Sequence, residues 1–393
     1  MPTMVTQAKN VQHYNTEGIL VRDVSSTLYK VNRESAPFQT FTRTVGRHTQ
    51  AKSTKIEWYK SVLNPTIDAI NNGAGYNDAL LTFAVDNPKY FKAGNVIVIP
   101  RTGEQMRVAS VDIAGLTITV GARAWGVTTA AALVDDDPIL ILSQAEAERG
   151  VVPAIRSTAL EGAYNYTQIF KTPWGLSGTA RAVGQAGGTY GGNNQMIQRE
   201  GRAIEHLRAI ELQSLFGEMK EDTSGDDPIR AMGGLRQFIS ENVWNVNGVM
   251  TEPGWKSWLR GVFREARGSG SRFVLADPLI CEGVSYWAQS KVQTTVDTKK
   301  YGMTVKYYFT DFGTVVMRPH WLLTAEYGYG GWMFAIDPEQ IEYRALPGRD
   351  THIQYNVQNP GEDQVIDQFL TEQSISIALP EVHGKAYGAT GYS

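Results

Sequence analysis

The stretch of sequence that decides the fold runs from residue 163 to residue 219. It opens with AYNYTQIFKTPWGLSGTA (163–180), where aromatic and polar residues alternate from Tyr164 to Gly178 as they do along a strand. The glycine-rich joint GQAGGTYGG (184–192) follows, and Asn193 or Asn194 can cap a helix after it. Residues 195–219 then predict one long helix, because apolar side chains recur there at turn-like spacing: Ile204, Leu207, Ile210, Leu212, Leu215 and Phe216.

Upstream of this stretch, the sequence predicts an arm, a strand and a small β domain. Residues 1–38 carry few periodic apolar positions and predict an arm without a core of its own, which would bind neighbouring chains. A strand is predicted over residues 54–63, where Ile56 and Trp58 alternate with charged or polar residues. Five short β-rich runs separated by turns then predict a small barrel or sandwich: 80–85, 95–99, 106–111, 116–120 and 139–142.

Downstream of the long helix, the pattern is mixed. Helices are predicted over residues 255–267, stopped by Gly268, and 278–291. Strands are predicted at 272–276, 304–310, 314–319, 331–336 and near 374–379, and the turn Thr310-Asp311-Phe312-Gly313 is expected to join two of them. The fold class expected for the whole chain is therefore α+β.

Composition excludes several classes of protein. The chain has 37 basic and 40 acidic residues, so it lacks the strong positive field of a protein that grips nucleic acid tightly. The single cysteine, Cys281, cannot form an intrachain disulfide, which suits a reducing compartment. Neither a signal peptide nor an apolar run of membrane-spanning length is present, so we expect a soluble protein that is not exported.

Signatures of catalysis are weak throughout the sequence. The glycine joint at 184–192 lacks the lysine of a phosphate-binding loop, and the six histidines are scattered without metal-ligand spacing. Asp135-Asp136-Asp137 lacks the alternating ligands of a calcium loop, which favours a solvated turn. Ser177 and Ser269 have no Gly-x-Ser-x-Gly elbow. We therefore expect no enzyme, no cofactor and no metal site.

Several blocks, taken in order, resemble the major capsid proteins of tailed bacteriophages. The most specific block is Asn165-Tyr166-Thr167-Gln168-Ile169-Phe170 with Ser177-Gly178-Thr179-Ala180 after it. Others are Ser35-Ala36-Pro37-Phe38, Lys55-Ile56-Glu57-Trp58, Thr310-Asp311-Phe312-Gly313-Thr314 and Asp337-Pro338, and together they cover about residues 36–384. The resemblance is to the HK97-type fold, in the branch with a β-barrel inserted in the extended loop.

This resemblance implies a division of the chain into domains. Residues 1–40 would be the N-terminal arm, 41–79 and 143–194 the extended loop with strands of the peripheral domain, and 80–142 the inserted small β-barrel. Residues 195–225 would be the spine helix of the peripheral domain, 226–342 the axial domain, and 343–393 the return to the peripheral domain with the C-terminal tail. The arm is too short and too polar to be a cleavable scaffolding segment, so either a separate scaffold exists or the segment has been removed.

Twelve residues are predicted to contact other subunits. The arm and extended loop cannot bury their own rings, and residues three apart on the long helix form a charged stripe that is either a solvated face or a contact ladder. Arg43, Arg47 and Lys52 could contact neighbours or DNA, or simply be solvated. The full set of candidates is Phe38, Phe41, Arg43, Arg47, Trp58, Tyr59, Tyr164, Phe170, Arg199, Arg202, Glu205 and Arg208.

The resemblance implies a function without catalysis. The chain would assemble into the icosahedral or prolate head shell that encloses phage double-stranded DNA, in the virion, after assembly in the host bacterial cytoplasm. Its partners would be copies of itself in hexamers and pentamers, a scaffolding protein, a portal, a decoration protein and weakly bound DNA, with no membrane. The alternatives are an encapsulin-like compartment shell and, less favoured, a β-rich carbohydrate-binding protein or hydrolase.

Overall fold

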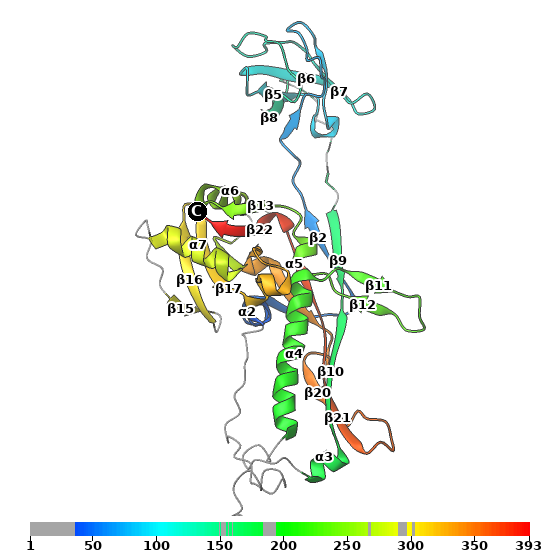
Figure 1. Cartoon of the computed structure of the whole chain (residues 1–393). Helices are drawn as coiled ribbons and strands as arrows, with labels where there is room; N and C mark the ends of the chain where they lie inside the picture. Colours follow the sequence, from blue (N-terminus) through cyan, green and yellow to red (C-terminus); the bar gives the residue numbers. More distant parts are fainter. Residues whose placement is uncertain are drawn as a thin grey trace, which may run out of the picture. The chain divides into compact units, whose positions relative to one another are not determined.

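The computed structural model describes residues 36–148, 150, 155, 157–158, 160–183, 194–265, 269–289, 297–300 and 303–393. The chain folds into two compact units (Figure 1). The first comprises residues up to Trp58 and from Ala163 onward, and the second comprises Tyr59–Gly162. Most of the predicted arm, the glycine joint at 184–192 and the stop at Gly268 lie outside the described residues. Both helices and sheets are present, as the α+β prediction requires.

The first unit contains a five-stranded sheet in the order β1 (Arg47–Gln50), β19 (Ile341–Ala345), β21 (Gln364–Ile377) and β10 (Gln168–Ser177), with β20 (His352–Gln354) also paired to β21. Only β1 runs parallel to its partner. The long helix α4 (Asn194–Phe216) packs along β10, as Figure 1 shows. The short helix α3 (Gly178–Val183) follows β10 directly.

A seven-stranded sheet forms the rest of this unit. Its order is β13 (Val243–Met250), β22 (Gly384–Tyr392), β18 (Met333–Ile336), β14 (Ser271–Ala276), β17 (Gly313–Pro319), β16 (Met303–Thr310) and β15 (Asp297–Lys300). Thr310 pairs with Gly313, so the predicted hairpin turn lies between β16 and β17. The strands β11 (Lys220–Asp222) and β12 (Ile229–Ala231) form a separate hairpin. One-turn 3-10 segments lie at Trp321–Leu323, Ala325–Tyr327, Pro338–Gln340 and Pro380–Val382.

Both faces of the seven-stranded sheet are covered, which explains the continuous apolar run in β14. Val274 and Ala276 belong to a core shared with helices α6 (Glu252–Val262) and α7 (Pro278–Gln289). Phe273 and Leu275, which point the opposite way, belong to a second core shared with helix α2 (Pro37–Val45), the end of α4 and helix α5 (Leu235–Phe238). A strand buried on both faces needs apolar residues at every position, not at alternate ones.

The start of the described chain corrects the sequence prediction. Residues 37–45 form helix α2, with Pro37 in its first turn, and not the end of a coreless arm. Phe38 and Phe41 are fully buried, and the Phe41 ring stacks on Phe273 with centroids 4.0 Å apart. Because these rings fill the chain's own core, they are not available to a neighbouring subunit. The prediction was wrong because a nine-residue helix with two phenylalanines gives too short a pattern to be detected.

A two-stranded sheet of β2 (Lys55–Ser61) and β9 (Leu160–Tyr166) lies where the chain passes between the two units. The strand at residues 54–63 was predicted, whereas the alternation predicted from Tyr164 to Gly178 covers only the end of β9 and continues into β10. We call this sheet the ribbon. Its two strands carry the labels β2 and β9 in Figure 1.

The second unit is a six-stranded antiparallel sheet. Its order is β3 (Ile67–Ala69), β8 (Pro138–Gln144), β5 (Asn95–Ile99), β6 (Glu104–Asp112), β7 (Thr117–Val120) and β4 (Thr82–Ala84), with a 3-10 turn at Pro88–Tyr90. The end strands meet through a bridge between Ile70 and Val85. Five of these strands match the predicted runs, whereas the three-residue strand β3 was missed. An apolar core of its own fills this unit.

The C-terminal segment also differs from the expected division. Residues 343–393 were expected to be the return to the peripheral domain with the C-terminal tail. Strand β22 instead pairs with β13 and β18 in the seven-stranded sheet. Its sequence, GKAYGATGY, has five glycine or alanine residues among polar and aromatic ones and therefore a weak strand pattern.

Candidate functional site

The ribbon carries exposed aromatic side chains whose neighbouring charges are already paired. Tyr59 is 65% exposed, and its ring lies over Gly162, where an added Cβ would approach the ring to 3.1 Å. Lys55 forms an ion pair with Glu57 (2.6 Å) and lies 4.3 Å from the centroid of the exposed Tyr164 ring. Exposed rings with neutralised charges around them are suited to contact with a protein surface.

Trp58 is only half-buried and packs on Phe238, with ring centroids 5.6 Å apart. Phe170, by contrast, is 8% exposed and packs with Ile210 and Met232 beneath α4. The prediction that Phe170 contacts another subunit was therefore wrong. Strand alternation was correctly detected there, but sequence alone does not say which face of a strand is covered by the chain itself.

The charged stripe on α4 is exposed along most of its length. Arg199, Arg202 and Glu205 are exposed, and Arg202 forms an ion pair with Glu205. Arg208 is half-buried, and its Nε atom has no hydrogen-bond partner among the described residues. Both interpretations of the stripe, a solvated face and a contact ladder, remain compatible with this exposure.

Arg43 is engaged within the chain. Its Nη2 atom donates to Tyr343 Oη (2.8 Å), Asp350 Oδ1 (3.0 Å) and Thr351 Oγ1 (2.8 Å). This guanidinium therefore links α2 to the turn after β19. Arg47 and Lys52 are exposed and remain available for contacts.

A buried carboxylate fixes α2 on α4. Glu211 accepts the backbone amides of Phe38 (2.7 Å) and Gln39 (2.8 Å), which are free because they lie in the first turn of α2. The same carboxylate lies 2.7 Å from His320 Nε2 in the segment after β17. Glu211 thus joins the start of the described chain, the long helix and the seven-stranded sheet.

His206 lies on the buried side of α4, against the edge strand β10 and its neighbour β21. Its Nδ1 is 2.9 Å from Thr172 Oγ1 on β10, and its Nε2 is 2.8 Å from Thr371 Oγ1 on β21. Burial, with a smaller contribution from Arg43, lowers the pKa of His206 to about 4. The imidazole is therefore neutral at physiological pH and acts as a structural hydrogen-bonding group.

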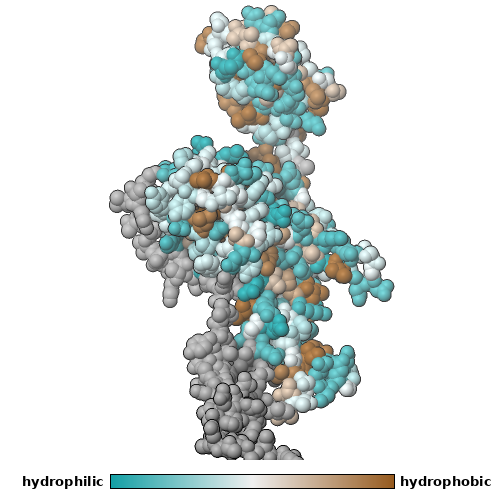
Figure 2. All heavy atoms as spheres, viewed as in Figure 1, coloured by the Kyte–Doolittle hydropathy of each residue, from teal (hydrophilic) through white to brown (hydrophobic). Residues whose placement is uncertain are grey.

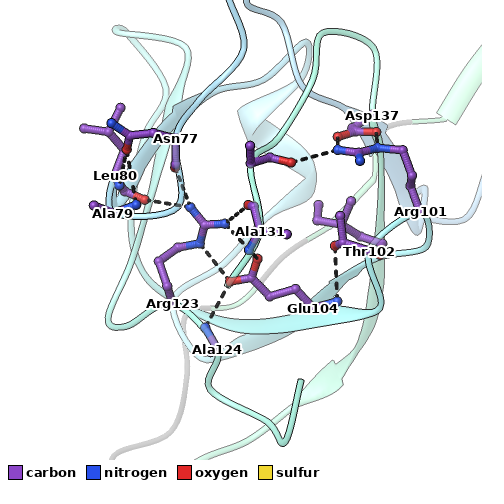
Figure 3. Close-up of polar contacts among 12 residues, drawn as sticks. Asn77, Ala79, Leu80, Arg101, Thr102, Glu104, Arg123, Ala124, Ala131 and Asp137 are labelled. Atoms are coloured by element: carbon purple, nitrogen blue, oxygen red, sulfur yellow. Dashed lines mark hydrogen bonds and ion pairs between the residues drawn. The ribbon is translucent and has the colours of Figure 1, made fainter. Parts of the chain in front are cut away.

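The second unit holds a buried ion pair that sequence reasoning missed. Arg123 donates through Nε and Nη2 to the two carboxylate oxygens of Glu104, at 2.8 and 2.7 Å (Figure 3). Burial alone would raise the pKa of Glu104, but the bonds from Arg123 and from the Ala124 and Ala131 amides hold it below its usual value. No short motif marks this pair, because its members are brought together only by the turn of the sheet.

The described residues offer little to a ligand. They contain no group of three or more His, Cys, Asp or Glu side chains able to hold a metal ion, and no helix among them is long and apolar enough to cross a membrane. A cavity of about 120 Å³ lies between α6, α7 and the β16–β17 hairpin. Its lining includes Trp255, Trp287, Phe309 and Phe312 but no histidine, serine or cysteine.

The exposed rings of the ribbon and the charged stripe on α4 are suited to contacts between protein chains. A family model described as SU10 major capsid protein matches residues 3–390. The chain belongs to the SU10 major capsid protein family. A capsid protein acts through its contacts, so the exposed rings of the ribbon and the charged stripe are the features of interest.

Individual relatives are similar to this capsid protein at low identity. The major capsid protein of Pseudomonas phage PaMx41 is 24% identical over 354 residues, which cover 86% of this chain and 81% of the relative. Among solved structures, Mycobacterium phage Bobi aligns over 97% of this chain and 99% of its own, with 7% identity and a TM-score of 0.48. The capsid of Myoviridae phage XM1 aligns over 98% and 100%, with 9% identity and a TM-score of 0.45. The SrpI encapsulin of Synechococcus elongatus aligns over 59% and 78%, with 11% identity and a TM-score of 0.39.

Proposed function

We propose that this capsid protein self-assembles into the icosahedral or prolate head shell that encloses phage double-stranded DNA. The observation that carries the proposal is the family match, which extends over residues 3–390. We assign no catalytic role and no cofactor to the chain. In an infected cell, assembly would take place in the bacterial cytoplasm, and the protein would end in the virion.

The proposal gives the parts of the chain the roles expected of an HK97-type subunit. The ribbon would be the base of the extended loop, and the unit from Tyr59 to Gly162 would be the inserted barrel. Helix α4 would be the spine of the peripheral domain, and the seven-stranded sheet would be the axial domain around five-fold and six-fold axes. What supports these roles is the order of elements along the chain together with the paired strands β2 and β9.

Copies of this chain in hexamers and pentamers would be its main partners. Contacts on the order of 1,000–2,000 Å², repeated through a closed lattice, give a durable shell without any single tight contact. A scaffolding protein, a portal and a decoration protein complete the expected set. Packaged DNA would bind weakly to exposed basic side chains such as Arg47 and Lys52, since the whole chain carries a net charge of −3.

The first test is assembly of the full chain, alone and with a scaffold protein encoded beside it, followed by sedimentation and negative-stain electron microscopy. Shells or five- and six-membered rings are expected. Leu160→Asp places a charge on the exposed side of the ribbon and should abolish them, because a buried unpaired charge is costly at an interface. Ile113→Asp, an equally exposed apolar position in a turn, is the matched control.

Two outcomes would count against the proposal. A chain that stays monomeric under every assembly condition contradicts the shell role. Shells from infected cells that hold a protein cargo and no DNA would favour the encapsulin-like alternative. Circular dichroism of Leu160→Asp is the control for folding: a spectrum unchanged from that of the original chain shows that the loss of shells is not caused by unfolding.

A further inference from the structure

The second unit contains a long connection that is held in one conformation without regular secondary structure. Between β7 and β8, residues 121–137 form a single isolated bridge, at Leu133, and otherwise turns and bends. Ordering a loop of this kind costs backbone entropy, on the order of 1–2 kcal/mol per residue. Something in the unit must therefore hold it in place.

The Glu104–Arg123 pair is the first of two clamps. Glu104 is fully buried, and its carboxylate also accepts the amides of Ala124 (3.0 Å) and Ala131 (3.1 Å) from the loop. Arg123 donates onward to the carbonyls of Asn77 (2.9 Å) and Leu80 (3.3 Å). The pair thus joins the loop to a second one, residues 77–81, as Figure 3 shows.

The second clamp holds the far end of the loop. Arg101 donates through Nε and Nη2 to Asp137, both at 2.6 Å, and through Nη2 to the carbonyl of Ala132 (2.8 Å). Asp137 also accepts the amide of Val134 (2.8 Å). A buried ion pair is seldom more stabilising than well-packed apolar residues of similar volume. This holds for the buried Glu104–Arg123 pair, and Arg101, whose side chain is 46% exposed, contributes even less to stability, so both clamps mainly fix the geometry of the loop.

The clamped loops present apolar side chains to solvent. Val127 is fully exposed, and four further apolar residues of the two loops are about half-exposed: Leu80, Leu81, Trp125 and Val134. We call these five residues the loop patch. Figure 2 shows brown, apolar residues on the surface of this unit among teal, hydrophilic ones. Exposed apolar side chains on loops that are held rigid have already lost the entropy that binding would otherwise cost.

Three unpaired carboxylates lie beside the loop patch, whereas the partly exposed Arg101 is already paired with Asp137. Asp78 lies in the first loop, and Asp135 and Asp136 directly follow Val134. All three are exposed, and none forms an ion pair with a residue that the structure describes. Two copies meeting through this patch would bring like charges together, which opposes association. A partner with lysine or arginine around an apolar centre would be complementary.

We infer that the loop patch is a docking surface for a protein other than this chain, with an apolar centre and a basic rim. This docking role is additional to the proposed shell role. The inference rests on the proposed function only because phage heads are the sample in which it is tested. If heads form normally and nothing occupies the patch, the inference fails while the proposed function stands.

The test uses heads purified from infected cells. Zero-length carbodiimide coupling joins carboxylates to lysines in contact with them, and mass spectrometry then identifies what is joined to Asp78, Asp135 and Asp136. We expect cross-links to lysines of another head protein, together with slower hydrogen exchange in residues 77–81 and 121–134 than in the purified chain. Cross-links to lysines of a second copy, or no cross-links with unchanged exchange, would overturn the inference.

Two variants separate docking from folding. Val127→Asp changes a side chain with no contacts to lose, so heads should form while the bound protein falls about tenfold or more, as for a central interface residue. Ile113→Asp makes the same change in the β6–β7 turn and should have no effect. Asp78→Lys, which breaks no hydrogen bond among the described residues, should weaken binding most at low salt. Unchanged binding in either loop variant would contradict the inference.

Discussion

At the scale of single residues, we expect Glu211 to contribute more to the free energy of unfolding than any exposed ion pair does. It is fully buried and accepts two backbone amides of α2 in addition to its contact with His320. Glu211→Ala should lower the free energy of unfolding by about 3–5 kcal/mol, because it leaves buried donors without an acceptor. Denaturant unfolding of the unassembled chain measures this.

Glu205→Ala on the same helix is the control. Its carboxylate is exposed and, among the residues that the structure describes, pairs with Arg202 alone, so the loss should be below about 1 kcal/mol. Equal losses in the two variants would show that the Glu211 contacts do not hold α2 in place.

A second residue-scale prediction concerns pH. The pKa of His206 is about 4 in the folded chain, against 6.5 for the free side chain, and that of His383 is also about 4 because of burial. The unfolded chain therefore takes up protons first. The stabilisation is full above about pH 6.5 and is lost as the pH falls toward 4, by on the order of 3 kcal/mol for each histidine.

The measurement is the urea midpoint of the unassembled chain between pH 7.5 and pH 5. His206→Gln keeps a hydrogen-bonding group but does not titrate, so it should reduce the pH dependence by about half, with His383 supplying the remainder. A pH dependence unchanged in this variant would refute the role of His206.

Single residues were also where sequence reasoning was weakest. Asn165 stands in the most specific block of the sequence, yet its role is set by partners far along the chain, the amide and carbonyl of Gly233 and the carbonyl of Ile375. Glu104 and Arg123 likewise give no local signal. Candidate contact residues chosen by type alone therefore included Phe38, Phe41 and Phe170, which the chain buries itself.

At the scale of elements, a close approach fixes how α5 meets the end of α4. A Cβ added to Gly234 would lie 2.6 Å from the carbonyl oxygens of both Gln213 and Ser214. Gly234→Ala should therefore destabilise the chain by about 1–3 kcal/mol through overpacking. Gly225→Ala, where the nearest atom would be 3.9 Å away, should be neutral or slightly stabilising.

Thermal unfolding of these two glycine variants, followed by circular dichroism, makes the comparison. A similar melting temperature for both would mean that the backbone at Gly234 can move aside. The long helix itself should remain helical in either case, because it also packs along β10.

Elements with a long or regular pattern were predictable. The helix α4 and five strands of the second unit lie where apolar periodicity placed them. Short elements and those defined by pairing were not: β3 has three residues, and β22 is recognisable only by its position between β13 and β18. Of the ribbon, the alternation of Ile56 and Trp58 predicted β2, whereas most of β9 lies before the alternation that begins at Tyr164.

At the scale of the whole molecule, each of the two units has apolar cores of its own. The apolar core of residues 70–139 belongs to the second unit, whereas the three other cores belong to the first. Cooperative unfolding depends on shared burial, so each unit should unfold in its own transition. Calorimetry of the unassembled full chain should show two transitions.

Two substitutions assign these transitions. Arg123→Met leaves the Glu104 carboxylate buried without its partner and should lower only one melting temperature, by more than about 10 °C for a domain of this size. Glu211→Ala should lower only the other. A single transition that moves with both substitutions would show that the ribbon couples the units into one cooperative fold. Two independent transitions would mean that the second unit, and the loop patch with it, stays folded when the first unit unfolds.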